Sequence, residues 1–133
     1  GDYAKAIQFA EQSIENDPTN IFFYINLGTM YYKNLMYPDA IKTFRLGLRG
    51  GVTEGGVELP GSPLSGDNVD AYYFYGLALA RAGECSEAVE IAQLLQQTVP
   101  NDDIAMYNAQ EMINICQGTS AEVEPEATAT LQP

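Results

Sequence analysis

The sequence predicts an all-α fold, an antiparallel helix-pair solenoid of about three units in which the first unit is truncated and a C-terminal helix packs on the last. Three observations lead to this prediction. A set of residues recurs along the chain, small residues stand where two helices would approach closely, and no strand pattern competes with the helical one.

The repeat appears as two fixed shifts in the sequence. Ala6 and Ala10 correspond to Ala40 and Phe44 at a shift of 34 residues. Ala40 corresponds to Ala88 after a further 48 residues, which is 34 plus an insert of 14. The units therefore share one length, and one of them carries an insertion.

The two complete units also share their internal spacing, and in each a glycine precedes the alanine by twelve residues. The corresponding residues are Tyr24, Leu27, Gly28 and Tyr31 in one unit and Tyr72, Tyr75, Gly76 and Leu79 in the other. Small residues let two helices approach, and the large ones fill the groove between them. This pattern resembles the tetratricopeptide repeat family, whose unit is a pair of antiparallel helices. The resemblance covers most of residues 1–117, with tyrosine replacing tryptophan at positions 24 and 72, tyrosine replacing leucine at 75 and valine replacing proline at 52.

Six helices are expected, at 3–16, 21–34, 38–48, 69–82, 86–98 and 103–116. Pro38 suits the first turn of the third helix, where a missing N–H costs nothing. Asn20 and Asn68 are expected to cap the second and fourth helices. Gly1 falls on the turn between the two helices of a unit, so we expect the first unit to lack its first helix.

Two segments are expected to lie outside the helices. Residues 49–67 contain two Gly-Gly pairs and two prolines, and they predict a long loop where the family has a short turn. A tolerated surface insertion and a functional arm both fit this loop. Residues 118–133 are rich in Ala, Thr, Glu and Pro and predict a flexible tail or linker after a repeat domain of 1–117.

Composition excludes several classes of function. The chain has 133 residues, of which 46% are hydrophobic, enough for one domain. Eighteen acidic against six basic residues give a net charge of −12, which argues against nucleic acid and anionic membranes as partners. The longest apolar stretch, 71–80, is half of what a bilayer requires, so direct membrane insertion of this segment is not expected.

Catalytic chemistry is not expected either. Histidine is absent, and the glycine pairs lack the lysine and hydroxyl residue that complete a phosphate-binding loop. We therefore expect no enzyme activity, no cofactor, no metal site and no catalytic residue.

The two cysteines leave an alternative open. Cys85 and Cys116 are too far apart in sequence for a CxxC motif. Cys85 begins the second helix of one unit and Cys116 ends the next helix, and stacking puts these ends on the same side. A disulfide in an oxidising compartment and two buried thiols in a reducing cytosol both fit. The compartment, extracytoplasmic or envelope-associated against cytoplasmic, stays open with them.

The resemblance implies a groove lined by the first helices, in which a protein or peptide partner binds. The residues at groove positions are Phe22, Ile25, Asn26, Thr29, Lys33, Asp70, Tyr73, Phe74, Leu77 and Arg81. Contact with missing N-terminal repeats, or with the long loop folded inward, would explain the same residues. Some members grip a C-terminal carboxylate, but here Asp70 and Phe74 stand where cations are needed, which favours a basic or apolar ligand.

The expected function is an interaction scaffold that binds a peptide or helix of a partner within a larger assembly. One alternative is an accessory domain of a larger membrane-anchored or envelope enzyme. Another is a structural solenoid that assembles with copies of itself.

Overall fold

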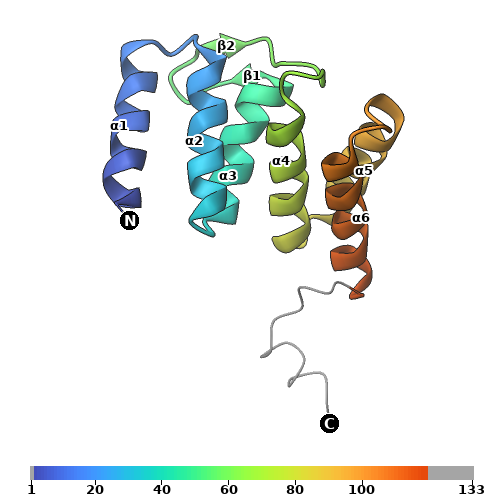
Figure 1. Ribbon diagram of the computed structural model, residues 1–133. Coiled ribbons are helices and arrows are strands. Elements are labelled where there is room, and N and C mark those ends of the chain that lie inside the picture. The colour runs from blue at the N-terminus through green and yellow to red at the C-terminus, as the bar shows by residue number, and fades with distance from the viewer. Residues whose placement is uncertain (1, 120–133) are drawn as a thin grey trace.

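The computed structural model describes residues 2–119, which form a row of helices joined by short turns and one long loop (Figure 1). The α-helices are α1 (Tyr3–Asn16), α2 (Ile21–Lys33), α3 (Tyr37–Phe44), α4 (Val69–Arg81), α5 (Cys85–Thr98) and α6 (Asp103–Gln117). The predicted all-α helix-pair solenoid is confirmed. The tail predicted for 118–133 lies outside the described residues except for its first two.

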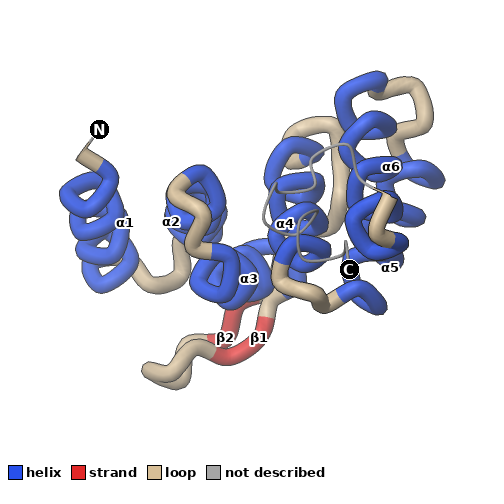
Figure 2. Tube along the Cα trace, turned by 90° about the horizontal axis from the view of Figure 1, so that it is seen from below, coloured by secondary structure: helices blue, strands red, loops and turns tan. Residues whose placement is uncertain are grey.

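The helices form two layers. In Figure 1, α2, α4 and α6 lie side by side in front, with α3 and α5 behind them, and the view from below in Figure 2 separates the layers. Helices α2 and α3 form one pair and α4 and α5 the next, while α1 lies at one end and α6 packs against both helices of the last pair. The first helices of successive units therefore share one face.

Close approach of α2 to α3 depends on Gly28. A Cβ at this position would lie 2.7 Å from Cδ1 of the fully buried Phe44. At Gly76, a Cβ would lie 2.6 Å from Cε of Met112 and 2.9 Å from Cγ2 of Ile91. The glycines thus mark the tightest helix contacts, as the repeat pattern predicted.

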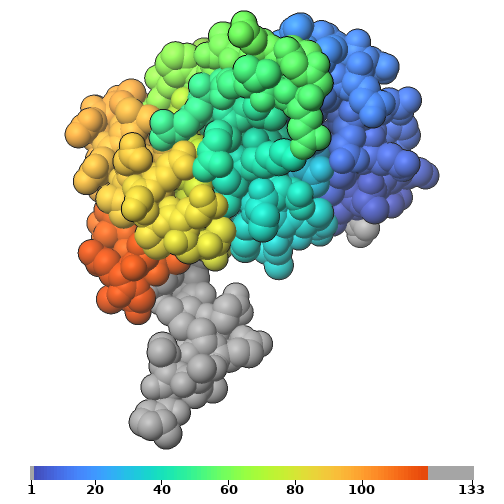
Figure 3. Space-filling model, turned by 180° about the vertical axis from the view of Figure 1, so that it is seen from behind, coloured from blue at the N-terminus to red at the C-terminus, as the bar shows by residue number. Residues whose placement is uncertain are grey.

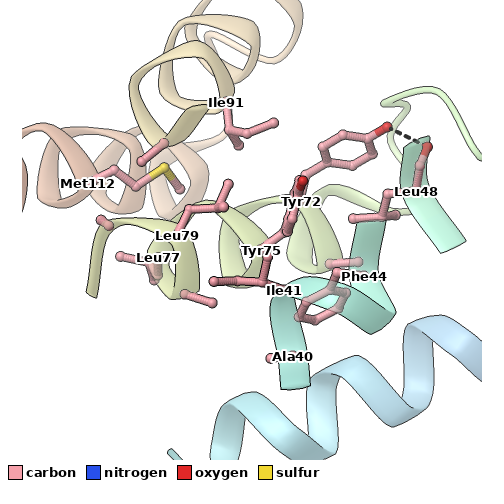
Figure 4. Packing of buried hydrophobic residues seen from close by; sticks show 14 of the residues in the cluster. Ala40, Ile41, Phe44, Leu48, Tyr72, Tyr75, Leu77, Leu79, Ile91 and Met112 are labelled. Carbon is pink, nitrogen blue, oxygen red and sulfur yellow. Dashed lines mark hydrogen bonds between the residues drawn. The ribbon is translucent and has the colours of Figure 1, made fainter. Parts of the chain in front are cut away.

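The buried side chains form one continuous core through both complete units (Figure 4). Phe44 of α3 contacts Tyr75 of α4, with ring centroids 6.1 Å apart. Tyr75 and Leu79 are both fully buried and carry the core onward to α5 and α6. Each unit is therefore stabilised by its neighbour as well as by its own pair.

The third helix differs from its prediction. It ends as an α-helix at Phe44, and the chain continues as a π-helical turn, η1 (Arg45–Arg49). This turn sets Gly47 against α2, where a Cβ would lie 3.1 Å from Cγ1 of Ile25. Gly50 ends the turn with a φ of 82°, a conformation that suits glycine.

The long loop contains two short strands that the sequence did not predict. Strands β1 (Gly51–Val52) and β2 (Glu58–Leu59) pair antiparallel, with Gly51 opposite Leu59. The hairpin lies on the side of α3, away from α2, α4 and α6 (Figure 2). The loop therefore does not fold onto the face of the first helices.

The two predicted caps have different outcomes. The Asn20 side chain accepts a hydrogen bond from the Phe22 amide at 3.1 Å, so this cap is confirmed. Asn68 stands at the N-cap position of α4 as predicted, but its side chain makes no bond to the amides of that helix. It accepts instead from the Ser65 amide at 2.8 Å and donates to the Ser62 hydroxyl at 3.0 Å, which fastens the end of the loop to the start of α4.

Candidate protein-binding face

The shared face of α2, α4 and α6, here called the first-helix face, carries the side chains that the sequence assigns to partner binding. Of the ten predicted residues, four are exposed, namely Phe22, Asn26, Lys33 and Asp70. Five are half-buried, namely Ile25, Thr29, Tyr73, Phe74 and Arg81. Phe22 has the most exposed aromatic ring of this set, at 69%.

The expectation that Leu77 faces a partner is wrong. Leu77 is 5% exposed and belongs to the hydrophobic core. Its helix, α4, packs between α2 and α6, so side chains that would be open on a terminal helix are covered here. The equivalent position on α2, Thr29, is half-buried and donates its hydroxyl to the Ile25 carbonyl at 2.9 Å.

Aromatic rings join α2 to α4 across this face. Phe74 lies with its ring centroid 5.0 Å from that of Tyr32 and 4.9 Å from that of Tyr73. The Lys33 ammonium lies 5.9 Å from the Phe74 ring, within cation–π range. Arg81 donates a hydrogen bond to the Tyr32 hydroxyl. Two predicted residues, Phe74 and Arg81, thus meet around a tyrosine that the sequence reasoning did not select.

Helix α6 extends the face, which the sequence reasoning also missed. Ile104 and Tyr107 are 63% and 64% exposed. They correspond to Phe22 and Ile25 at a shift of 82 residues, the sum of the two shifts in the repeat. Pro18 and Pro100 are separated by the same 82 residues, a signal in the sequence that could have found them.

Helices α2, α4 and α6 run in the same direction, so acidic side chains in their first turns lie at one edge of the face and basic side chains in their last turns at the other. Asp70 and Asp103 lie in the first turns of α4 and α6, where the helix dipole favours carboxylates. Lys33 and Arg81 lie in the last turns of α2 and α4. Burial raises the pKa of Tyr73, and the charges of Asp70 and Asp102 add to the rise. One edge of the face is therefore acidic and the opposite edge carries cations.

The two cysteines form a disulfide. Cys85 at the start of α5 and Cys116 near the end of α6 are bonded, with their Cα atoms 5.6 Å apart. Both residues are half-buried. Of the two alternatives that the sequence left open, the structure has the disulfide and not the two free thiols. The bond joins α6 covalently to the last unit.

Other kinds of site are not found in the described part of the chain. Residues 2–119 contain no cluster of three or more potential metal-ligating carboxylates and thiols. Within the same residues, no helix combines the length and the apolar character that crossing a membrane would require.

Comparison with known proteins agrees with this architecture. Residues 9–42 match the family model of the tetratricopeptide repeat. This segment is similar to a tetratricopeptide repeat. The matched segment covers residues 9–16 of α1, all of α2 and residues 37–42 of α3, so the match includes Gly28 but ends before Phe44. Tetratricopeptide repeats generally mediate protein–protein interaction. No curated protein matches the sequence.

Proposed function

We propose that this chain is a non-enzymatic scaffold that binds a peptide or helix of a partner protein on its first-helix face, as part of a larger assembly. The observation that carries the proposal is the exposure of large apolar side chains on this face, at Phe22, Ile104 and Tyr107. Aromatic side chains on a folded surface are the usual anchors of protein interfaces, since they bury much area at low entropic cost.

Charge supports a particular orientation of the partner. A bound segment is favoured when its cations lie near Asp70 and Asp103 and its carboxylates near Lys33 and Arg81. The net charge of −12 favours basic or apolar segments over acidic ones. The half-buried cluster around Phe74 would supply the middle of the contact.

The partner can be sought by cross-linking mass spectrometry on native material, with a carboxylate-reactive linker because lysines are scarce and with the digest left unreduced. A foreign protein linked at Asp70 or Asp103 would support the scaffold. Links confined to the parent chain would favour an accessory domain of a larger enzyme. Links between copies of this chain would favour a self-assembling solenoid.

The contact itself is tested by changing Tyr107 to alanine. Because the ring is 64% exposed, its loss should leave the melting temperature unchanged and weaken binding of the captured partner by about 1–3 kcal/mol. The matched control is Leu35→Ala, which removes a side chain that is also exposed (72%) from the turn between α2 and α3. Equal effects of the two changes on binding would contradict the assignment of the face.

A further inference from the structure

A cleft of about 920 Å³ lies outside the first-helix face, on the side where α3 and the hairpin lie. Its lining comes from α1, from α2, from α3 with η1, and from residues 50–57 of the inserted loop. Figure 3 shows this side of the molecule, with the loop in green next to α3 in teal and α1 in blue. The insertion thus contributes one wall of the cleft.

The loop wall is fixed rather than loosely attached. Glu54 of the loop accepts a hydrogen bond from the Lys42 ammonium of α3 at 2.8 Å. The loop closes on itself through the Thr53 amide, which donates to the Val57 carbonyl at 2.9 Å. Where the loop returns, the Tyr72 hydroxyl donates to the Ser62 carbonyl at 2.6 Å. A wall that is already ordered costs little additional entropy when a ligand binds.

The lining combines apolar side chains with an excess of carboxylates. Ile14 of α1, Leu46 of η1 and Val52 of β1 supply apolar surface, and Val52 is 62% exposed. Three glutamates and two cations line the cleft, a difference of one negative charge.

The cations of the lining are already neutralised. Lys42 is paired with Glu54, and Arg45 with Glu87 at 2.7 Å. On the α1 wall, by contrast, Glu15 forms no ion pair with any residue of 2–119.

Glu11, also on α1, adds a second carboxylate to this wall. Glu11 accepts a hydrogen bond from the Tyr31 hydroxyl at 3.1 Å, a neutral donor that leaves its charge in place. The pKa of Tyr31 is raised to about 12, first by burial and then by its hydrogen bond to Glu11 and by the charges of Glu11 and Asp39. This wall therefore suits a cation.

We propose that this cleft is a second protein-binding site, which takes an apolar segment of a partner that carries a lysine or arginine. Its aliphatic side chains pack on Ile14, Leu46 and Val52, and its cation lies at Glu11 and Glu15. The site is independent of the first-helix face, so a partner on one face leaves the other open.

The probe is a fluorescein-labelled peptide, acetyl-Gly-Leu-Lys-Val-Arg-Leu-Gly-amide, with a counterpart in which glutamate replaces Lys and Arg. Fluorescence anisotropy with the intact chain measures affinity, and amide chemical shifts locate the peptide. We expect the basic peptide to bind and to shift the amides of 14–15 and 46–54, and the acidic one not to bind.

The decisive comparison separates this site from general attraction to an acidic protein. Glu15→Lys should lower the affinity for the basic peptide by about tenfold, because it places a cation on the α1 wall. Glu90→Lys changes the net charge equally but lies exposed on α5, so its effect should stay below about twofold at physiological salt. Thermal melts of both variants verify folding. The proposal is overturned if the two variants weaken binding equally, if the shifts fall on the first-helix face, or if neither peptide binds.

Discussion

At the scale of single residues, Glu87 joins the two complete units. Its carboxylate accepts hydrogen bonds from the Tyr75 hydroxyl and, at 2.7 Å, from Arg45, and it lies 3.2 Å from Nε of Arg49. Burial alone would raise the pKa of Glu87. The hydrogen bonds and the charges of the two arginines outweigh burial and hold that pKa below its ordinary value of 4.5.

This lowered pKa predicts how stability depends on pH. The contribution of Glu87 is fully present above pH 4.5 and is lost as the pH falls through the lowered pKa of the folded state. Glu87→Gln should therefore cost about 1–3 kcal/mol at neutral pH and flatten the loss of stability on acidification. Urea denaturation across this range measures both effects. Glu90→Gln, an exposed carboxylate on the same helix, should change neither, and a similar result for the two variants would contradict the role of Glu87.

Gly28 gives a second prediction at the residue scale. An added Cβ would lie within 2.9 Å of three ring atoms of Phe44, and this ring is fully buried. Gly28→Ala should lower the free energy of unfolding by about 1–2 kcal/mol, since overpacking outweighs the gain in helix propensity. Thermal denaturation measures the change. Gly66→Ala is the control, because no atom lies within 4 Å of a Cβ there, and a stable Gly28→Ala variant would disprove the repeat alignment.

At the scale of elements, the inserted loop is held by one tyrosine of the repeat itself. The Tyr72 hydroxyl donates to the Ser62 carbonyl and lies 3.3 Å from the Leu48 carbonyl, so it joins the two ends of the loop (Figure 4). Its ring is buried at 4% exposure, and burial raises its pKa. A residue of the repeat pattern thus also positions the insertion.

We predict that Tyr72→Phe loosens the loop without unfolding the helices. Loss of the hydroxyl removes the hydrogen bond to the Ser62 carbonyl and should cost about 1 kcal/mol, while the Leu48 carbonyl keeps its bond from the Ser62 amide. Hydrogen exchange of the amides of 50–62 should accelerate, while amides in α4 and α5 keep their protection. Tyr107→Phe, on an exposed ring, is the control. Faster exchange throughout the chain would indicate loss of the core instead.

The elements also show what sequence could predict. Gly28, Gly76 and their alanine partners predicted the helix pairs, because close packing of two helices restricts residue size at fixed spacings. The hairpin was not predictable, since its strands are only two residues each and too short to show an alternating pattern in the sequence. Leu77 was misassigned because its burial follows from the packing of α4 between α2 and α6, which spacing within one unit does not show.

The first-helix face was predictable only in part. Exposed positions such as Phe22 follow from the repeat, because equivalent positions on α2 and α4 point the same way. Tyr32 was missed because it touches Phe74 and Arg81 of the next unit, a contact between units that spacing within one unit does not show.

At the scale of the whole molecule, the stack is closed at one end by a covalent bond. The disulfide between Cys85 and Cys116 spans a sequence separation of 31 residues and holds α5 against α6. Reduction should lower the free energy of unfolding by about 3–4 kcal/mol, because it releases the constraint on the unfolded chain. Thermal melts with and without a thiol reductant measure the change. A Cys85→Ser, Cys116→Ser double variant should have the melting temperature of the reduced protein, with or without the reductant. If reduction left the melting temperature of the parent protein unchanged, the stabilising role of the disulfide would be contradicted.

The same bond changes how the molecule would respond to mechanical load. A force applied between the ends of the chain passes through the sulfur atoms and bypasses the residues between them. The oxidised protein should therefore extend by roughly 100 Å less than the reduced one when pulled to full length. Helices α5 and α6 would stay linked to each other while the other helices unfold under force. The part of the solenoid that carries Ile104 and Tyr107 should therefore resist extension longer in the oxidised protein than in the reduced one.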